Sequence, residues 1–208
     1  MHIKICGITN LDDGLAAIDA GADYLGFNFY PKSQRFIAPE DCTPIASALK
    51  RHASHVTLIG IFVNEPPARV AAILRDCGLD LAQMHGDETP EELAELKGRA
   101  YKGLRGTGVK NLSDFVSSGQ TPALLLDAYS PNAYGGTGHT VDWDAARLIA
   151  EQFSIFLAGG LTPENVADAI AQVNPWGVDV ASGVETSPRK KDWARMQAFV
   201  KATKDGRR

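Results

Sequence analysis

Cysteine is scarce in this 208-residue chain, which contains only Cys6, Cys42 and Cys77. Their number is odd, their spacings are wide and no CxxC pair occurs, so neither a disulfide scaffold nor a cysteine zinc site is expected. The histidines also lack metal-ligand spacing, since only His85 falls at the end of a predicted strand. We therefore predict no metal site and a reducing, cytoplasmic environment.

Long apolar runs and an excess of positive charge are absent as well. No uncharged run approaches the ~18 residues of a membrane span, and residues 1–5 read as a strand rather than as the start of a signal peptide. The chain has 21 Lys and Arg against 25 Asp and Glu, a net charge of −4, whereas a nucleic-acid binder needs a basic surface. We expect neither a membrane nor a nucleic acid as a partner.

Eight short β-rich runs alternate with amphipathic segments along the whole chain. They cover residues 2–8, 24–30, 57–63, 81–85, 100–105, 123–129, 155–160 and 177–182. Strict alternation of this kind predicts an α/β protein with a parallel sheet. The count of eight favours a closed (β/α)8 TIM barrel over a doubly wound open sheet. No linker or low-complexity segment divides residues 1–208, so we expect one catalytic domain.

In such a barrel the reactive groups lie at the carboxyl ends of the strands. Period-two alternation turns Ile3 and Ile5 toward the helices and Cys6 toward the barrel axis, and it turns Asp127 inward as well. A lone cysteine is usually a small buried apolar residue. Burial of an unpaired carboxylate in an apolar strand costs free energy, which favours a functional role for Asp127. Together, Cys6 and Asp127 would place a thiol and a carboxyl on one rim, which suits acid–base chemistry.

Lys4 shares the inward face of Cys6, and Asp179 points inward from the last strand. The last strand closes a barrel against the first, and a buried lysine needs a partner. We therefore predict a Lys4–Asp179 ion pair beneath the site. The alternative is that Lys4 simply fills the lower barrel.

Small residues cluster after three consecutive late strands. Backbone N–H groups in these loops hold phosphate in many barrels, because small residues allow close approach. The GxxxxGK[ST] and GxGxxG phosphate motifs are absent. The predicted phosphate ligands are Gly136, Gly138, Gly159, Gly160, Ser182 and Gly183.

Seven motifs occur in order between residues 2 and about 192. They are KICGIT (4–9), GFNFYPKSQR (26–35), QMHGDE (83–88), LLDA (125–128), GGTG (135–138), AGGLTPEN (158–165) and DVASGVE (179–185). With them the chain resembles the phosphoribosylanthranilate isomerases of tryptophan biosynthesis. The resemblance implies a barrel without metal or cofactor. It also implies the Amadori rearrangement of N-(5′-phosphoribosyl)anthranilate to 1-(o-carboxyphenylamino)-1-deoxyribulose 5-phosphate. We expect a monomer or a homodimer.

By motif position, the resemblance implies that Cys6 is the general base and Asp127 the general acid. Arg35 falls where the family holds the anthranilate carboxylate, and His85 and Asp179 fall at substrate contacts. This chemistry needs Asp127 protonated by a burial-raised pKa. It also needs the pKa of Cys6 lowered by nearby positive charge.

The chain departs from the family pattern at Asn28, at Gln34 and in the basic segment 187–192. These departures concern loop rigidity and affinity rather than the reaction.

Three other functions are less consistent with the residues. Indole-3-glycerol-phosphate synthase needs catalytic lysines near the rim, but Lys4 and Lys102 lie lower in their strands. A metal-dependent sugar-phosphate epimerase needs several His and Asp ligands at strand ends. A catalytically silent sugar-phosphate binder would keep the glycine loops but would have no use for both Cys6 and Asp127.

Overall fold

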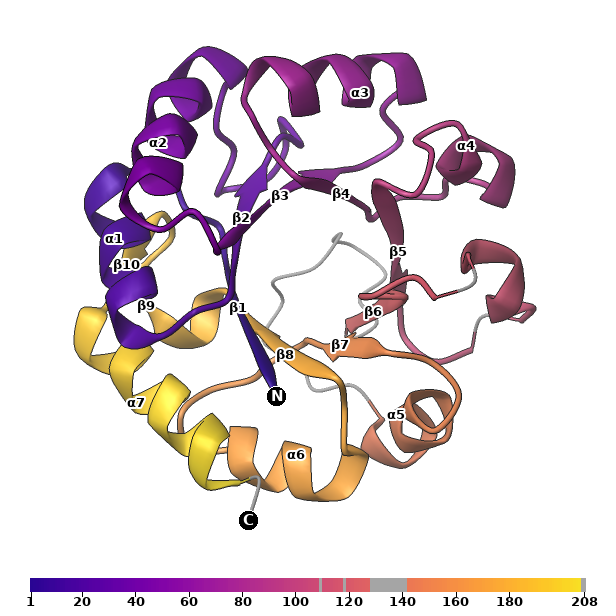
Figure 1. Ribbon diagram of the computed structural model, residues 1–208. Helices are drawn as coiled ribbons and strands as arrows, with labels where there is room; N and C mark the ends of the chain where they lie inside the picture. Colours follow the sequence, from indigo (N-terminus) through magenta and orange to yellow (C-terminus); the bar gives the residue numbers. More distant parts are fainter. Residues whose placement is uncertain (109, 118, 128–141, 207–208) are drawn as a thin grey trace.

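The computed structural model describes residues 1–108, 110–117, 119–127 and 142–206. Eight parallel strands form a closed barrel in chain order, in which β1 also pairs with β8 (Figure 1). This confirms the predicted barrel and excludes the doubly wound sheet. The strands are β1 (His2–Cys6), β2 (Tyr24–Asn28), β3 (Thr57–Phe62), β4 (Leu81–Met84), β5 (Ala100–Arg105), β6 (Leu124–Asp127), β7 (Ile155–Leu157) and β8 (Gly177–Val180).

The helices form a ring outside the strands (Figure 1). They are α1 (Leu11–Ala20), α2 (Pro39–His52), α3 (Pro67–Asp76), α4 (Pro90–Ala94), α5 (Trp143–Ala150), α6 (Val166–Val173) and α7 (Trp193–Asp205). No helix in the described part of the chain is long and apolar enough to cross a membrane.

Two features differ from the predicted alternation. The described residues between β5 and β6 form a 3₁₀ helix, η1 (Leu112–Phe115), where an α-helix was expected. Ser113 and Asp114 favour this outcome, because short polar side chains compete for backbone hydrogen bonds. After β8, a second 3₁₀ helix, η2 (Ser182–Val184), leads into a small antiparallel hairpin of β9 (Glu185–Ser187) and β10 (Lys190–Lys191). The sequence did not predict this hairpin.

Local signals fix the helix ends. Asn10 caps α1 by accepting a hydrogen bond from the backbone N–H of Asp13, and Gly21 ends the helix with a φ of 106°. Thr89 and Glu92 form a reciprocal capping box at the start of α4.

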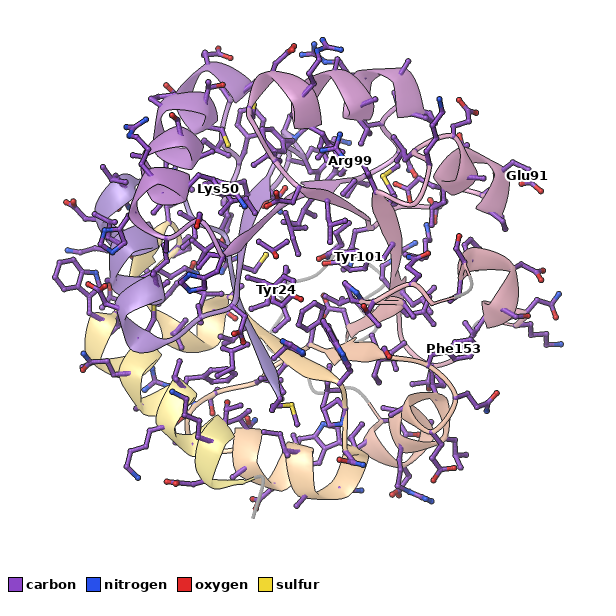
Figure 2. The ribbon with its side chains drawn as sticks, viewed as in Figure 1. Tyr24, Lys50, Glu91, Arg99, Tyr101 and Phe153 are labelled. Atoms are coloured by element: carbon purple, nitrogen blue, oxygen red, sulfur yellow. The ribbon has the colours of Figure 1, made fainter. Side chains whose placement is uncertain are left out.

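The alternation along the strands divides the core in two, as predicted. Ile3, Ile5 and Leu124 belong to the large outer core between sheet and helices. Tyr101 and Leu125 belong to a smaller cluster inside the barrel. Figure 2 shows Tyr101 within the ring of strands.

The late strands are shorter than predicted. β7 ends at Leu157 because Gly159 and Gly160 adopt positive φ angles of 86° and 62°, which a strand cannot contain. β8 ends at Val180, so Ser182 lies in η2. The small residues after both strands therefore lie in the loops beyond the carboxyl ends.

Candidate active site

A pocket opens at the carboxyl ends of the strands, where barrel chemistry is expected. Its lining includes Cys6, Asn28, Arg35, His85, Asp127 and Asp179. The five residues predicted to act on or bind the substrate therefore lie in one place, although they come from distant parts of the chain. Asn28, one of the departures from the family pattern, is also in this lining.

Lys4 and Asp179 form the predicted ion pair. They are direct partners in the register of β1 and β8, so two inward-facing side chains meet. Lys4 Nζ lies 3.0 Å from Asp179 Oδ1, and the two side chains are 0% and 10% exposed. Burial alone would lower the pKa of Lys4, but the charges of Asp179, Cys6 and Tyr101 and the hydrogen bond to Asp179 together outweigh it, so the net shift is upward. Lys4 is thus a paired cation, not a filler of the lower barrel.

The thiol of Cys6 does not have the lowered pKa that was expected. Burial raises its pKa, and the nearby Lys4 and Lys191 ammonium groups only partly oppose that shift. Asp179 adds to the increase because its negative charge disfavours a thiolate. Burial and the charge of Asp179 together therefore outweigh the two cations.

Arg35 is held by a carboxylate that the sequence did not identify. Its Nε donates to Glu185 Oε1 at 2.9 Å, and its Nη2 donates to Glu185 Oε2 at 2.6 Å. Such a two-pronged pair fixes the guanidinium plane. Burial opposes the charge of Arg35, but the bonds to Glu185 leave its pKa raised.

Lys191 connects this pair to β1. Its Nζ donates to the Cys6 carbonyl oxygen at 2.6 Å, to the Ala181 carbonyl oxygen at 3.1 Å and to Glu185 Oε1 at 2.9 Å. Its side chain is fully buried, and burial lowers its pKa despite Glu185. Part of the basic segment 187–192 is therefore built into the site instead of forming a solvated loop.

His85 lies beside Asp127 in the pocket lining. Its Nε2 is 3.6 Å from Asp127 Oδ2. Burial lowers the pKa of His85 to about 3, and the charges of Lys4, Lys102 and Arg105 contribute in the same direction. His85 is consequently a neutral imidazole at physiological pH.

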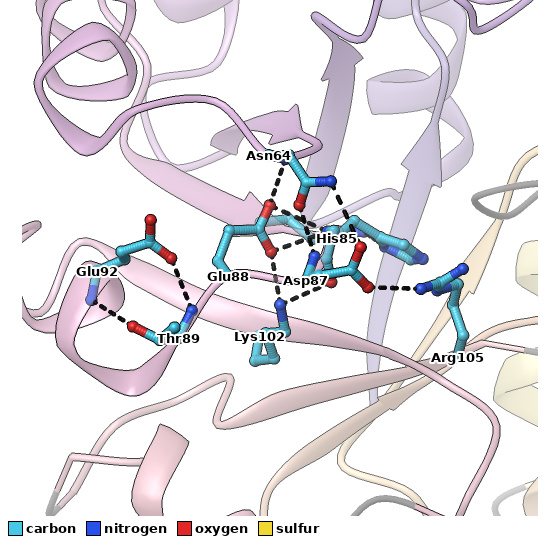
Figure 3. A network of polar contacts seen from close by, with 10 residues as sticks. Asn64, His85, Asp87, Glu88, Thr89, Glu92, Lys102 and Arg105 are labelled. Carbon is cyan, nitrogen blue, oxygen red and sulfur yellow. Dashed lines mark hydrogen bonds and ion pairs between the residues drawn. The ribbon is translucent and has the colours of Figure 1, made fainter.

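A buried carboxylate anchors the loop that follows His85 (Figure 3). Glu88 accepts from the backbone N–H groups of Gly86, at 2.8 Å, and Asn64, at 2.8 Å, and from Lys102 Nζ at 2.5 Å. Lys102 Nζ also donates to the Gly86 carbonyl oxygen at 2.8 Å. Lys102 therefore stabilises this loop through its bonds to Glu88 and Gly86, and it does not act as a catalytic acid at the rim.

The predicted phosphate loops are partly described. The loop after β7 packs closely against η2. A Cβ added to Gly183 would lie 1.9 Å from the Leu161 carbonyl oxygen. Only glycine allows the loops carrying Gly159, Gly160 and Ser182 to come this close. Gly136 and Gly138 lie outside the described residues. The phosphate site itself stays a prediction.

Sequence reasoning missed Glu185, Lys191 and Gln83. Gln83 could have been found, since it lies two residues before His85 and shares its inward face. Glu185 and Lys191 carried no such signal, because they lie in a hairpin that was not predicted.

A sequence model of the family N-(5′-phosphoribosyl)anthranilate (PRA) isomerase matches residues 3–202. The chain belongs to this isomerase family. The N-(5′-phosphoribosyl)anthranilate isomerase of Pelobacter propionicus is 47% identical over 207 residues, covering 100% of this chain and 97% of its own length. That of Geobacter metallireducens is 45% identical over 204 residues, covering 98% and 99%.

Solved structures of family members have the same fold. Phosphoribosyl anthranilate isomerase from Thermus thermophilus has a TM-score of 0.87 at 34% identity, with 99% of both chains covered. A family member in complex with reduced 1-(o-carboxyphenylamino)-1-deoxyribulose 5-phosphate has a TM-score of 0.81 at 36% identity, with the same coverage. The isomerase barrel described here is therefore that of its family.

Proposed function

We propose that this protein catalyses the Amadori rearrangement of N-(5′-phosphoribosyl)anthranilate to 1-(o-carboxyphenylamino)-1-deoxyribulose 5-phosphate, a step of tryptophan biosynthesis. The observation that carries the proposal is that Cys6, Asp127 and Arg35 line one pocket in a barrel of this family. A thiol, a carboxyl and a guanidinium are the groups that the reaction needs.

Asp127 starts the reaction as the general acid. It protonates the furanose ring oxygen, the C1′–O bond breaks, and the nitrogen lone pair forms a C1′=N iminium ion. The iminium acidifies the C2′–H bond, and Cys6 removes that proton as a thiolate. The released electron pair forms the enolamine, which takes a proton at C1′ and loses its hydroxyl proton to become the ketone. Protons taken and given balance, so the reaction is an isomerisation.

The remaining residues hold the two ends of the substrate. Glu185 engages Nε and Nη2 of Arg35, which leaves Nη1 directed to the anthranilate carboxylate. The loops with Gly159, Gly160 and Ser182 bind the phosphate, together with the glycines after β6.

The raised pKa of Cys6 has a consequence for this mechanism. The thiolate is a minor species at neutral pH in the free protein. The value of kcat/KM should therefore rise as the pH increases toward the pKa of Cys6.

A fluorescence assay of phosphoribosylanthranilate consumption tests the proposal. The wild-type protein should consume the substrate without added metal or cofactor. Cys6→Ala and Asp127→Asn should each lower kcat by ~10²–10⁴-fold with smaller effects on KM. Cys77→Ala is the matched control, because Cys77 is buried outside the pocket. Wild-type kcat in either site variant would remove that residue from the mechanism.

We further propose a single catalytic domain over residues 1–208 that works in the cytoplasm as a monomer or a homodimer. One solved relative, from Thermotoga maritima, is described as monomers of a dimeric isomerase. Sedimentation analysis of the purified protein decides between the two states.

A further inference from the structure

His85 contacts a chain of buried side chains that the proposed mechanism does not use. Gln83 Nε2 lies 2.7 Å from His85 Nδ1. The O–H group of Tyr101 donates to Gln83 Oε1 at 2.9 Å. All three residues are buried, at 4% exposure or less. Asp127 Oδ2 faces the other ring nitrogen of His85, so a polar chain links Tyr101, through Gln83 and His85, to the proposed acid.

The orientation of the Gln83 amide determines where the imidazole carries its proton. Tyr101 occupies the amide oxygen, so the amide nitrogen faces His85 and donates to Nδ1. An imidazole nitrogen that accepts a hydrogen bond has no proton. Since His85 is neutral, its single proton is on Nε2, the nitrogen that faces Asp127.

The charges around His85 support this protonation state. Lys4 from β1, and Lys102 and Arg105 from β5, all disfavour a second proton on the ring. Asp127 from β6 is the carboxyl that faces it. The opposite tautomer would direct the Nε2 lone pair at the oxygen of Asp127, which is repulsive when that group is ionised.

The position of the ring depends on Gly103 of β5. A Cβ at this position would lie 2.5 Å from His85 Nδ1 and 2.9 Å from its Cγ. The imidazole therefore packs directly on the backbone of β5. Among the described residues Nε2 has no hydrogen-bond partner, so the ring is held from the Nδ1 side.

We propose that Tyr101 and Gln83 are positioning residues that hold His85 as the Nε2–H tautomer, so that His85 cannot take the proton that Asp127 delivers to the substrate. The proposal rests on the role of Asp127 given under the proposed function. An Nε2 lone pair would compete for the acid proton, whereas an Nε2–H group directs that proton to the other carboxyl oxygen. The proton of the acid then stays available for the furanose oxygen.

The first test is spectroscopic and needs no substrate. Long-range ¹H–¹⁵N correlation spectra of the ¹⁵N-labelled wild-type protein report which ring nitrogen carries the proton, and the spectrum of His85→Asn assigns the signals. We expect His85 to have a protonated Nε2 and a non-protonated Nδ1 from pH 6 to pH 8. A protonated Nδ1, or an imidazolium at pH 7, would overturn the proposal.

The second test changes the tautomer with little change in volume. In Gln83→Glu, the carboxylate accepts at His85 Nδ1, so the proton should move from Nε2 to Nδ1. We expect kcat to fall at least about tenfold with little change in KM, because acid catalysis is worth ~10²–10⁴-fold. Tyr101→Phe frees the amide to rotate, and it should produce a mixed population of tautomers and a smaller loss of kcat. Gln152→Glu, in the exposed turn after α5, is the matched control.

The two tests separate the inference from the function on which it rests. A Gln83→Glu protein with the Nδ1–H tautomer and wild-type kcat would refute the positioning role. If Gln83→Glu does not fold, Tyr101→Phe decides the same point. A wild-type protein that does not consume phosphoribosylanthranilate would refute the proposed function, and the spectrum would still decide the tautomer.

Discussion

Removal of Lys4 should expose how much the buried ion pair contributes to the barrel. Lys4 Nζ and Asp179 Oδ1 are 3.0 Å apart with side chains 0% and 10% exposed. At an effective dielectric constant of ~20, two unit charges at this distance attract by about 5.5 kcal/mol before desolvation is subtracted. Lys4→Met leaves the Asp179 carboxylate without this partner, which should destabilise the fold by ~3–5 kcal/mol. For a chain of this size that corresponds to a fall in Tm of roughly 6–20 °C.

A double-mutant cycle measured by urea denaturation isolates the pair. Lys4→Met and Asp179→Asn should each destabilise strongly, and the double variant should be less destabilised than their sum by about 2–3 kcal/mol. The pKa of Lys4 is raised above its ordinary 10.5. Its contribution is therefore fully present below pH 10.5 and is lost only as the pH rises through the folded value. Measurements at pH 7.5 thus record the whole effect.

The same variant tests the electrostatics of the thiol. Lys4 lowers the pKa of Cys6, so Lys4→Met should shift the pH midpoint of Cys6 alkylation further upward. Lys201→Met is the control, since its pair with Asp205 is exposed and should be worth less than about 1 kcal/mol. The reasoning fails if Lys4→Met costs no more than Lys201→Met, or if the cycle is additive.

Three further predictions concern the rest of the pocket. The pKa of His85 is about 3 when folded and 6.5 when unfolded, so stability should fall by about 1.4 kcal/mol per pH unit below pH 6.5; His85→Gln should flatten this slope in urea titrations at pH 6.5 and 5, and an unchanged slope would contradict the assigned pKa. Gly183→Ala should weaken phosphate binding at least tenfold in calorimetry, because its Cβ would lie 1.9 Å from the Leu161 carbonyl oxygen; unaltered affinity would place the phosphate elsewhere. Glu185→Gln should raise KM about tenfold and leave kcat nearly unchanged, because one charged hydrogen bond that fixes Arg35 is worth ~1.5–3 kcal/mol; a fall in kcat alone would argue against a binding role for Arg35.

The parts of the site that follow from strand periodicity were predictable from the sequence. Period-two alternation identifies which side chains face inward, and a closed barrel of eight strands makes the first and last strands neighbours. Those two rules suffice for the Lys4–Asp179 pair and for the shared rim of Cys6 and Asp127. They require no knowledge of loop structure.

The remaining features depend on loop geometry and on the balance of opposing effects. Glu185 and Lys191 reach the site through a short hairpin whose path no local pattern encodes. The direction of the Cys6 pKa shift depends on opposing effects. Burial and Asp179 raise the pKa, whereas Lys4 and Lys191 lower it. Sequence identifies the charges, but the sign of such a difference needs their positions and the degree of burial.

The bond from Lys191 Nζ to the Cys6 carbonyl oxygen has a consequence for synthesis on the ribosome. Cys6 leaves the exit tunnel long before Asp179, Glu185 and Lys191, which are translated more than 170 residues later. A nascent chain or a proteolytic fragment that stops before Asp179 would have Lys4 without its carboxylate and β1 without its neighbour β8. Synthesis proceeds from the N-terminus, so the Cys6 thiol acquires its charged surroundings only after most of the barrel strands have been made.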